Sequence, residues 1–395
     1  MRVAIIHEWL STYGGSERVT EEFLRLYPDA DLFTIVDFFP EHLRRFLDGR
    51  KITCSFIQGM PFARKHFRWY LPLMPLAVEQ FDVSDYGLIV SNAHAVAKGV
   101  LSRPHQLHVS YVQSPMRYAW DLENHYLKSA GMSHGIKAIG ARSLMHYMRM
   151  WDTRTANGVD QFIANSSFIA RRIRKTYGRD STVVHPPVDV DSFELREDKD
   201  DYYITVSRLV SYKRIDILVD AFTAMPERRL VVIGDGPEMS RIKARAGRNV
   251  EIIGHQPFAV MKDLLAGARG FMFAAEEDFG IAPVEAQACG TPVIAYGRGG
   301  IRDTVVPGET GIFFDQQTSE AVIGAVDEFE RIDRFEPRRV RLNAERFSTV
   351  RFRREFERVV AGKLAEGECT VPSAPITSRG RAARPLESER RSAAV

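Results

Sequence analysis

Two cationic side chains, Arg208 and Lys213, stand five residues apart in the segment 207–214 (SRLVSYKR), directly after the β-branched run 203–206. Arginine offers a planar fork to phosphate oxygens and lysine offers a compact point charge, so the pair suits a diphosphate. On spacing alone, a solvated pair of cations beside Asp216 explains the segment equally well. The pair becomes informative only together with a second segment.

That second segment, residues 276–285 (EEDFGIAPVE), holds two glutamates, Glu277 and Glu285, around a glycine-proline turn. Gly280 lets backbone approach a ligand, and Pro283 suits the first turn of a helix. The N–H groups of Phe279, Gly280 and Ile281 are then free for an anion. The glutamates lie too far apart along the chain for the close carboxylate pair of a glycosidase. They suit hydrogen bonds to hydroxyls at two ends of one sugar-containing ligand, whereas acids favoured by the helix dipole explain one glutamate alone.

The first half of the chain carries two further candidates, each directly after a predicted strand. Gly14 and Gly15 form a glycine-rich turn after the strand 3–6, and His94 follows the strand 88–90. A plain strand-to-helix turn explains the glycines as well as a ligand does. A lone histidine is more often structural, but the end of a parallel strand in this kind of fold favours a functional one.

The elements that must position these residues alternate along the whole chain. Short β-branched runs predict the strands 3–6, 88–90, 109–112, 161–164, 203–207, 230–233, 250–253, 270–274, 292–296 and 311–314. Amphipathic stretches separate them, for example 215–225. This alternation predicts an α/β protein with two Rossmann-like, doubly wound parallel sheets and a ligand cleft at the carboxyl ends of their strands.

The boundary between the two sheets is marked by His185-Pro-Pro-Val-Asp189 and by the polar run 194–201. Because prolines restrict the chain and the polar run has no apolar period, we expect a linker there. After the last strand, residues 321–331 and roughly 338–363 are expected to be helices. The predicted parts are a domain of residues 1–190, a domain of residues 191–345, a helix over 346–366 that packs back on the first domain, and a disordered tail over 369–395.

Length and composition fit about two soluble domains: 395 residues, 45% hydrophobic, 27% charged. The formal net charge of +3 divides unevenly, with 23 basic and 18 acidic side chains in residues 1–190 against 26 and 31 in residues 191–368. This balance excludes a uniformly basic nucleic-acid coat. Three cysteines without zinc spacing, and only about four apolar residues near the start, lead us to expect a cytoplasmic protein.

One segment suggests contact with a membrane. Residues 60–76 (MPFARKHFRWYLPLMPL) interleave aromatic and basic side chains, the composition of an interfacial segment attracted to anionic lipid. A buried loop and helix with a solvated edge fits equally well. The basic balance of the first half favours a peripheral location on the inner face of the cytoplasmic membrane, or a polyprenyl-diphosphate acceptor.

Taken together, the motifs resemble a known family. Glu277 and Glu285 with seven residues between them, preceded by Arg208, Lys213 and the early glycine pair, are similar to the signature of the retaining glycosyltransferase family 4. The two-sheet plan is similar to its GT-B fold, and the likeness covers essentially residues 1–365. The segments 91–100, 112–121 and 162–171 also resemble the branch with O-antigen and surface-polysaccharide mannosyltransferases that use GDP-mannose.

The resemblance implies roles for these residues. The first domain would face the acceptor and the second would bind the nucleotide-sugar donor. Arg208 and Lys213 would bind the donor diphosphate, Glu277 the donor sugar and Glu285 the ribose. The remaining implied donor contacts are His94 near the reacting carbon, the amides of Phe279, Gly280 and Ile281, and the turn at Gly14 and Gly15.

The implied reaction is transfer of a hexosyl, expected to be mannosyl, unit from GDP-mannose to a glycan or a polyprenyl-diphosphate-linked acceptor, with retention of configuration. The alternatives are a nucleotide-sugar 2-epimerase of the same architecture and a non-catalytic nucleotide-sugar-binding scaffold. No cofactor, metal or nucleic acid is expected. Three similar patterns are set aside: Gly234-Asp-Gly236 lacks the last glycine of a dinucleotide fingerprint, Asp189-Val-Asp191 lies at the linker, and no P-loop is present.

Overall fold

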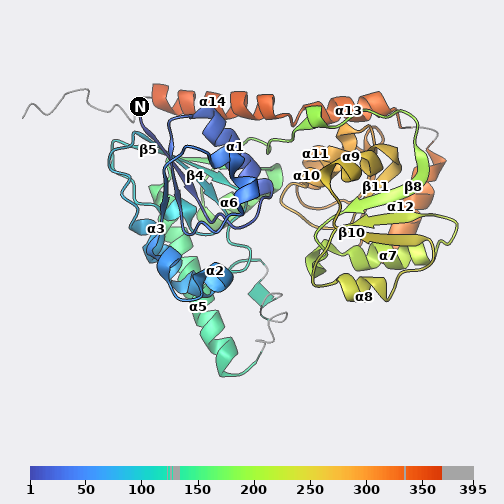
Figure 1. Ribbon diagram of the computed structural model, residues 1–395, viewed down its shortest axis with the longest axis horizontal. Coiled ribbons are helices and arrows are strands. Elements are labelled where there is room, and N and C mark those ends of the chain that lie inside the picture. Colours follow the sequence, from blue (N-terminus) through green and yellow to red (C-terminus); the bar gives the residue numbers. More distant parts are fainter. Residues whose placement is uncertain (122, 125–126, 128–133, 333–334, 367–395) are drawn as a thin grey trace, which may run out of the picture.

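The protein is an α/β molecule of two domains that lie side by side (Figure 1). It was analysed as a computed structural model that describes residues 1–121, 123–124, 127, 134–332 and 335–366. Each domain has one parallel sheet with helices on both faces, as the alternation of strands and helices predicts, and the predicted α/β class is confirmed.

Within the described residues, the first domain has seven parallel strands in the order β3-β2-β1-β4-β5-β6-β7. They are β1 (Val3–His7), β2 (Asp31–Thr34), β3 (Ile52–Cys54), β4 (Leu88–Ala93), β5 (Leu107–Val112), β6 (Gln161–Ala164) and β7 (Thr182–Val183). The α-helices around them are α1 (Gly15–Leu26), α2 (Ala63–His66), α3 (Met74–Glu79), α5 (Ile136–Thr155) and α6 (Ser167–Tyr177). Short 3-10 helices connect them: η1 (Glu41–Leu47), η2 (Phe56–Gly59), η3 (Phe67–Leu73), η4 (Ala97–Gly99) and η5 (Ala156–Gly158).

The second domain, again within the described residues, has six parallel strands in the order β10-β9-β8-β11-β12-β13. They are β8 (Asp200–Val206), β9 (Leu230–Ile233), β10 (Val250–Gly254), β11 (Ala268–Phe273), β12 (Val293–Tyr296) and β13 (Gly311–Phe314). The accompanying helices are η6 (Val190–Ser192), η7 (Ser211–Lys213), α7 (Ile215–Thr223), α8 (Met239–Lys243), α9 (Phe258–Gly267), α10 (Ile281–Ala288), α11 (Ile301–Thr304), α12 (Ser319–Arg331) and α13 (Pro337–Glu345). The last helix, α14 (Thr349–Ala365), lies on the first domain.

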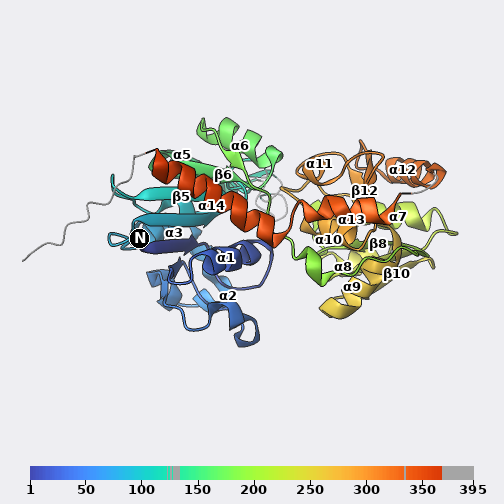
Figure 2. The same ribbon diagram turned by 90° about the horizontal axis from the view of Figure 1, so that it is seen from above.

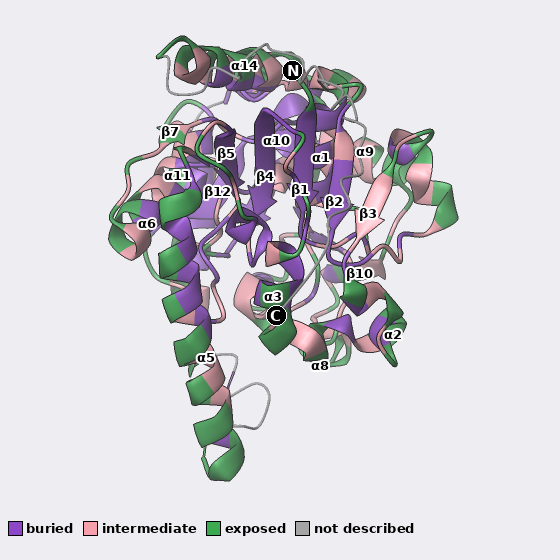
Figure 3. Ribbon diagram, turned by 90° about the vertical axis from the view of Figure 1, so that its left-hand side faces the viewer, coloured by how far each residue is buried: buried purple, intermediate pink, exposed green. Residues whose placement is uncertain are grey.

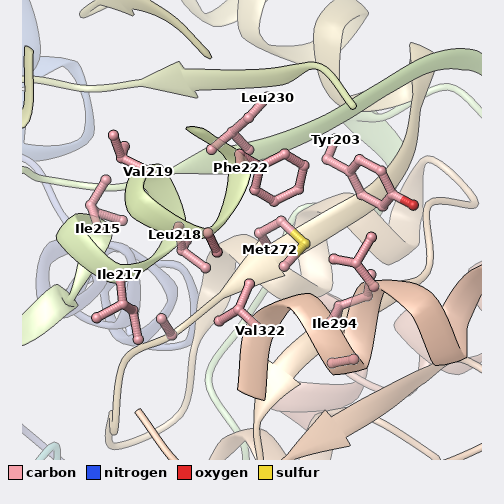
Figure 4. Packing of buried hydrophobic residues seen from close by; sticks show 14 of the residues in the cluster. Tyr203, Ile215, Ile217, Leu218, Val219, Phe222, Leu230, Met272, Ile294 and Val322 are labelled. Carbon is pink, nitrogen blue, oxygen red and sulfur yellow. The ribbon is translucent and has the colours of Figure 1, made fainter. Parts of the chain in front are cut away.

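Both sheets are buried on their two faces, which explains their continuous apolar strands. In β1, Ala4 and Ile6 face one hydrophobic cluster, and Val3 and Ile5 face the other. The second sheet behaves in the same way, and Figure 4 shows the cluster in which the ring of Phe222 packs between α7 and the sheet. Alternate residues of each strand thus fix both helix layers to the sheet.

Strand order places the candidate residues at the centre of each sheet. The order reverses between β1 and β4 in the first domain and between β8 and β11 in the second. At such a switch point the connections leave in opposite directions, so the carboxyl ends of these strands are open to a ligand. Every candidate motif named from the sequence follows one of these four strands.

The sequence analysis missed three strands and joined two helices. β3 and β7 have three and two residues, too short for a period to be visible. β2 has four, but Asp31 and Thr34 at its ends are polar, so it is not a continuous apolar run. The single helix predicted over 338–363 is wrong: α13 ends at Glu345 and α14 begins at Thr349. The side chain of Ser348 accepts a hydrogen bond from the Arg351 N–H and starts the new helix.

The break occurs because the chain crosses between the domains there. Phe347 is buried in the core of the second domain, whereas Phe352 and Phe356 of α14 pack against Phe23 of α1. The Val188 N–H donates to the Phe347 carbonyl at 2.9 Å, so the outward and return crossings are bonded to each other. Figure 2 shows α14 lying along the first domain beside α1. The predicted disordered tail, residues 369–395, lies outside the described residues.

Candidate active site

The glycine turn after β1 is held in place by a buried glutamate. One Glu17 carboxylate oxygen accepts the Gly14 N–H at 2.9 Å, and the other lies 3.3 Å from the His7 Nε2. Burial favours a raised pKa for Glu17, but the hydrogen bond and charge of His7 outweigh it and lower that pKa. The Glu17 carboxylate therefore holds the turn in place through its hydrogen bond with the Gly14 N–H.

Gly15 brings the two domains together. A β-carbon at Gly15 would lie 2.9 Å from Cδ1 of Ile281, at the start of α10 in the second domain. A side chain at this position would require the end of the Ile281 side chain to move, so the absence of a β-carbon at Gly15 lets the two elements approach closely. The structure thereby places two separately predicted motifs, the glycine turn and the Phe279–Ile281 turn, against each other.

His94 stands on a loop that a buried carboxylate organises. Glu8, directly after β1, accepts hydrogen bonds from the backbone N–H groups of His94, Ala95, Val96 and Ala97 at 2.7–3.1 Å. Glu8 is completely buried. Burial lowers the pKa of His94, although the charge of Glu8 opposes this, so the imidazole is neutral at pH 7. The His94 ring also packs edge-on against Trp9 at 4.8 Å.

Two glycines allow the chain after β9 to approach closely the loop after β8 that carries Arg208. A β-carbon at Gly234 would lie 1.8 Å from the Ser207 carbonyl oxygen, and one at Gly236 would lie 2.3 Å from that of Leu209. The rejected dinucleotide motif therefore has a structural use, which is to let the end of β9 contact this loop. Arg208 itself remains exposed.

Lys213 and Glu277, predicted separately, are in direct contact across the ends of β8 and β11. Both side chains are largely shielded from solvent. Desolvation, followed by the charge on Arg117 of the first domain, lowers the pKa of Lys213 to about 8. Lys213 is thus a cation that gives up its proton more easily than an ordinary lysine.

A pair of glycines, Gly299 and Gly300, packs against the loop that carries Glu277. The Gly300 N–H donates to the Glu277 carbonyl at 2.8 Å, and a β-carbon at Gly299 would lie 2.4 Å from the same oxygen. After the loop, Gly280 adopts a φ of +94°, which favours glycine, and α10 begins without a side-chain cap. This helix end is suited to an anion, as predicted from the sequence.

Glu285, in the second turn of α10, already has a partner from the other domain. The Arg18 Nη1 donates to Glu285 Oε1 at 2.6 Å, and the Glu285 side chain is only 7% exposed. Desolvation favours a lower pKa for Arg18, but Glu285 outweighs it and raises that pKa. A ligand hydroxyl can therefore reach Glu285 only beside this ion pair or in place of it.

A second group of charges joins the domains next to Glu277. Asp278 Oδ1 lies 3.3 Å from an Arg172 nitrogen and 3.6 Å from an Arg117 nitrogen, both in the first domain. Burial raises the pKa of Asp278, and the two arginines oppose this. Asp303 adds hydrogen bonds from the Ser167 N–H and hydroxyl at 2.6 and 2.5 Å. These contacts hold the facing loops together.

Sequence reasoning missed Glu8 and Arg18, and it included Arg68 and Arg117 only as members of the segments 60–76 and 112–121, without predicting their charge interactions with the second domain. Arg117 and Arg18 contact second-domain residues more than 150 positions away along the chain. Arg68 is identified by its charge environment, because desolvation and the nearby charge of Arg208 lower its pKa. Only Glu8 had a usable signal: it directly follows the central strand, the position already used to select His94.

The Asp189-Val-Asp191 pattern shows no sign of a metal site. Asp191 is exposed on the short helix η6, and its nearest cation is Arg341 at 4.0 Å. Across residues 1–366, leaving aside the undescribed gaps, no group of three or more histidine, cysteine, aspartate or glutamate side chains could hold a metal ion. The structure therefore offers this pattern no support as a metal ligand.

The segment 60–76 folds as α2, η3 and α3, and it divides into two faces. Phe67 and Met74 pack into the core, whereas Phe62 and Trp69 are 75% and 70% exposed. The buried side chains fit a loop and helix with a solvated edge, and contact with a membrane stays a prediction. None of the described helices is long and apolar enough to cross a membrane.

Comparison with known proteins gives two adjoining family matches. Residues 13–192 match the model described as Glycosyltransferase Family 4, and residues 189–346 match the model described as Glycosyl transferases group 1. A GDP-mannose-dependent phosphatidylinositol monomannoside mannosyltransferase from Corynebacterium glutamicum is 31% identical over 205 residues, which are 43% of this chain and 54% of the relative. D-inositol 3-phosphate glycosyltransferase from a Mycobacterium species is 29% identical over 190 residues, 42% of this chain and 43% of the relative. The chain thus spans about half the length of the curated relatives it matches.

Solved structures share the fold at low identity. The Anabaena protein HepE in complex with UDP and glucose superposes with a TM-score of 0.66 at 16% identity, covering 90% of this chain and 99% of that one. Sucrose-phosphate synthase from Thermosynechococcus elongatus gives 0.71 at 17% identity over 92% and 99%. With one family model for each domain and this two-sheet architecture, the chain belongs to the family 4 glycosyltransferases of GT-B fold.

Proposed function

We propose that the protein is a retaining glycosyltransferase that moves a mannosyl unit from GDP-mannose to a lipid-linked oligosaccharide or surface-polysaccharide acceptor. The observation that carries the proposal is the contact between Lys213 and Glu277, next to the uncapped start of α10 and opposite the Gly14-Gly15 turn. A phosphate-binding cation and a sugar-binding carboxylate are then adjacent, as a nucleotide sugar requires.

In this proposal each charged group acts on one part of the donor. Arg208, Lys213 and the start of α10 stabilise the charge that develops on the leaving diphosphate, the contribution that is usually largest in such transfers. Glu277 and neutral His94 orient the sugar, and Glu285 binds the ribose. The departing phosphate oxygen takes the proton of the acceptor hydroxyl as the new glycosidic bond forms, so configuration at the transferred carbon is retained.

The identity of the donor rests on the relatives, two of which are named for GDP-mannose, whereas the HepE structures hold UDP. We expect GDP and GDP-mannose to raise the thermal stability of the full chain, and UDP, ADP and dTDP to leave it unchanged. A ligand that binds only the native state adds RT ln(1 + [L]/Kd), about 2.7 kcal/mol at a hundredfold excess over Kd. A shift with UDP and none with GDP would contradict the mannose assignment.

Product analysis tests the reaction itself. Incubation with GDP-mannose and a lipid-linked acceptor is expected to yield a mannosylated lipid and GDP, with full activity in EDTA because no step needs a metal. Interconversion of the nucleotide sugar without an acceptor would identify a 2-epimerase instead. Binding of the donor without turnover towards any acceptor would indicate a scaffold.

Peripheral contact with the cytoplasmic face of an anionic membrane is part of the same proposal. Its support is the exposed Phe62 and Trp69 beside exposed Arg64 and Lys65, a combination that favours an anionic lipid surface. We expect the protein to sediment with vesicles containing phosphatidylglycerol and to remain in solution with vesicles of phosphatidylcholine alone. Sedimentation with neither vesicle at physiological salt would contradict the proposal.

A further inference from the structure

A cavity of about 770 Å³ lies in the first domain beside His94. That volume is within the range of small-molecule binding pockets. Its walls come from η3, α3, α5, the loops after β1 and β4, and the described part of the segment between β5 and α5. They are mostly apolar: Trp9, Leu71, Met74, Tyr118, Leu144 and Met145. We call this space the α5 chamber. Figure 3 shows α5 as a long helix that projects from the sheet, with mostly exposed residues along its outer part.

The charged residues at the edge of the α5 chamber differ in whether they form ion pairs. Glu123 is engaged by Arg149 and, at 3.9 Å, by Arg142, both on α5. Arg68 and Lys137 also line the chamber, and neither forms an ion pair among the described residues. The chamber edge therefore has two cations that no carboxylate of the described part of the chain neutralises.

Arg68 also lies where a bound anion would relieve repulsion between cations. Its guanidinium lies over the rings of Trp9 and Phe67, with centroid distances of 5.4 and 4.4 Å. The charge of Arg208 reaches it from the second domain, and together with desolvation it lowers the pKa of Arg68. Two like charges near each other repel, and an anion placed beside them removes that cost.

We infer that the α5 chamber binds the hydrocarbon chain of a phosphate-bearing lipid acceptor and that Arg68 binds its phosphate. The inference rests on the proposed function, because His94 is the point at which the chamber meets the predicted donor site. The apolar walls suit a hydrocarbon chain, whereas a sugar alone would need polar partners that these walls lack. Exposed Ile136 and Ile139 continue the apolar surface along the outer turns of α5.

The test is calorimetric titration of the full chain with three probes: farnesyl phosphate, farnesol and glucose 1-phosphate. We expect farnesyl phosphate to bind at least about tenfold more tightly than either of the others, since only it offers both the chain and the charge-assisted contact. Arg68→Gln is expected to reduce its affinity about tenfold, to the level of farnesol. Ala141→Phe, which places a ring in the chamber, is expected to weaken farnesyl phosphate and farnesol alike.

Arg103→Gln is the matched control, because Arg103 is exposed in the same domain and does not line the chamber. It is expected to change the affinity for farnesyl phosphate less than twofold. An unchanged affinity in Arg68→Gln overturns the phosphate assignment, and glucose 1-phosphate binding as tightly as farnesyl phosphate overturns the lipid assignment. The thermal shift with GDP, measured on every variant, reports folding and the donor site separately, so failure of the proposed function is recognised independently.

Discussion

Replacement of Lys213 by methionine is expected to lower kcat for sugar transfer by about 10²–10³-fold, the usual loss when one preorganised charge at a developing anion is removed. Methionine keeps most of the length and packing of lysine, so the contact surface with Glu277 changes little while the charge is lost. Lys243→Met on α8 is the control, because Lys243 is exposed in the same domain. Full turnover of Lys213→Met would show that this cation does not act on the leaving group.

The lowered pKa of Lys213 adds a pH dependence. With a pKa of about 8 in the free protein, the ammonium is present below that pH and is lost above it. We therefore expect kcat/KM for the donor to fall as the pH rises through about 8. In Lys213→Arg the guanidinium remains charged, so the fall should move to higher pH even if the rate is lower. The same fall near pH 8 in both proteins would assign it to another group.

The architecture could be predicted from the sequence because buried parallel strands are continuous apolar runs that alternate with amphipathic helices. β6 (Gln161–Ala164), β9 and β13 lie where they were expected. The short edge strands β3 and β7 form by pairing with a neighbour, and that information is not local. The break at Phe347 likewise depends on which domain buries each phenylalanine, which no helical period records.

The candidate site divides in the same way. Residues directly after β1, β4, β8 and β11 could be predicted, because the carboxyl ends of parallel strands meet at one edge. The partners from the other domain could not. Arg18 is 267 residues from Glu285, and Arg117 reaches the Glu276 carbonyl at 3.3 Å. Such contacts depend on how the two domains dock, so only the structure reveals that Asp278 and Glu285 each have a cation of the first domain opposite them.

Those pairs have a consequence for the donor site. Glu277, Asp278 and Glu285 all belong to the second domain, and cations of the first domain hold two of them. A bound nucleotide sugar would add negative charge between the same domains. The facing loops thus already contain cations of the kind that a diphosphate requires. In the proposed donor site, Arg18 stays paired with Glu285 until a ligand hydroxyl replaces it.

The largest expected loss of stability comes from a residue that does not belong to the donor site. Glu8 is fully buried, and its carboxylate accepts four backbone N–H groups of the loop 94–97. Glu8→Ala leaves these donors without a partner in a region that water does not reach. Each buried unsatisfied group costs about 1–3 kcal/mol, and partial relaxation of the loop reduces the sum. We expect the free energy of unfolding to fall by about 3–5 kcal/mol.

Urea unfolding measures this loss, and a second variant separates charge from shape. Glu8→Gln keeps the size of the side chain but turns an NH₂ donor towards other donors, so we expect an intermediate loss. Glu41→Ala, whose side chain is 96% exposed, should unfold like the unmodified protein. Because His94 is the first residue that Glu8 holds, kcat should also fall in Glu8→Gln at temperatures where the protein is still folded. A Glu8→Gln protein with normal stability but reduced kcat would show that the carboxylate positions His94 without supporting the fold. That outcome would mean that the loop 94–97 can lose its hydrogen bonds to Glu8 while the rest of the domain stays folded.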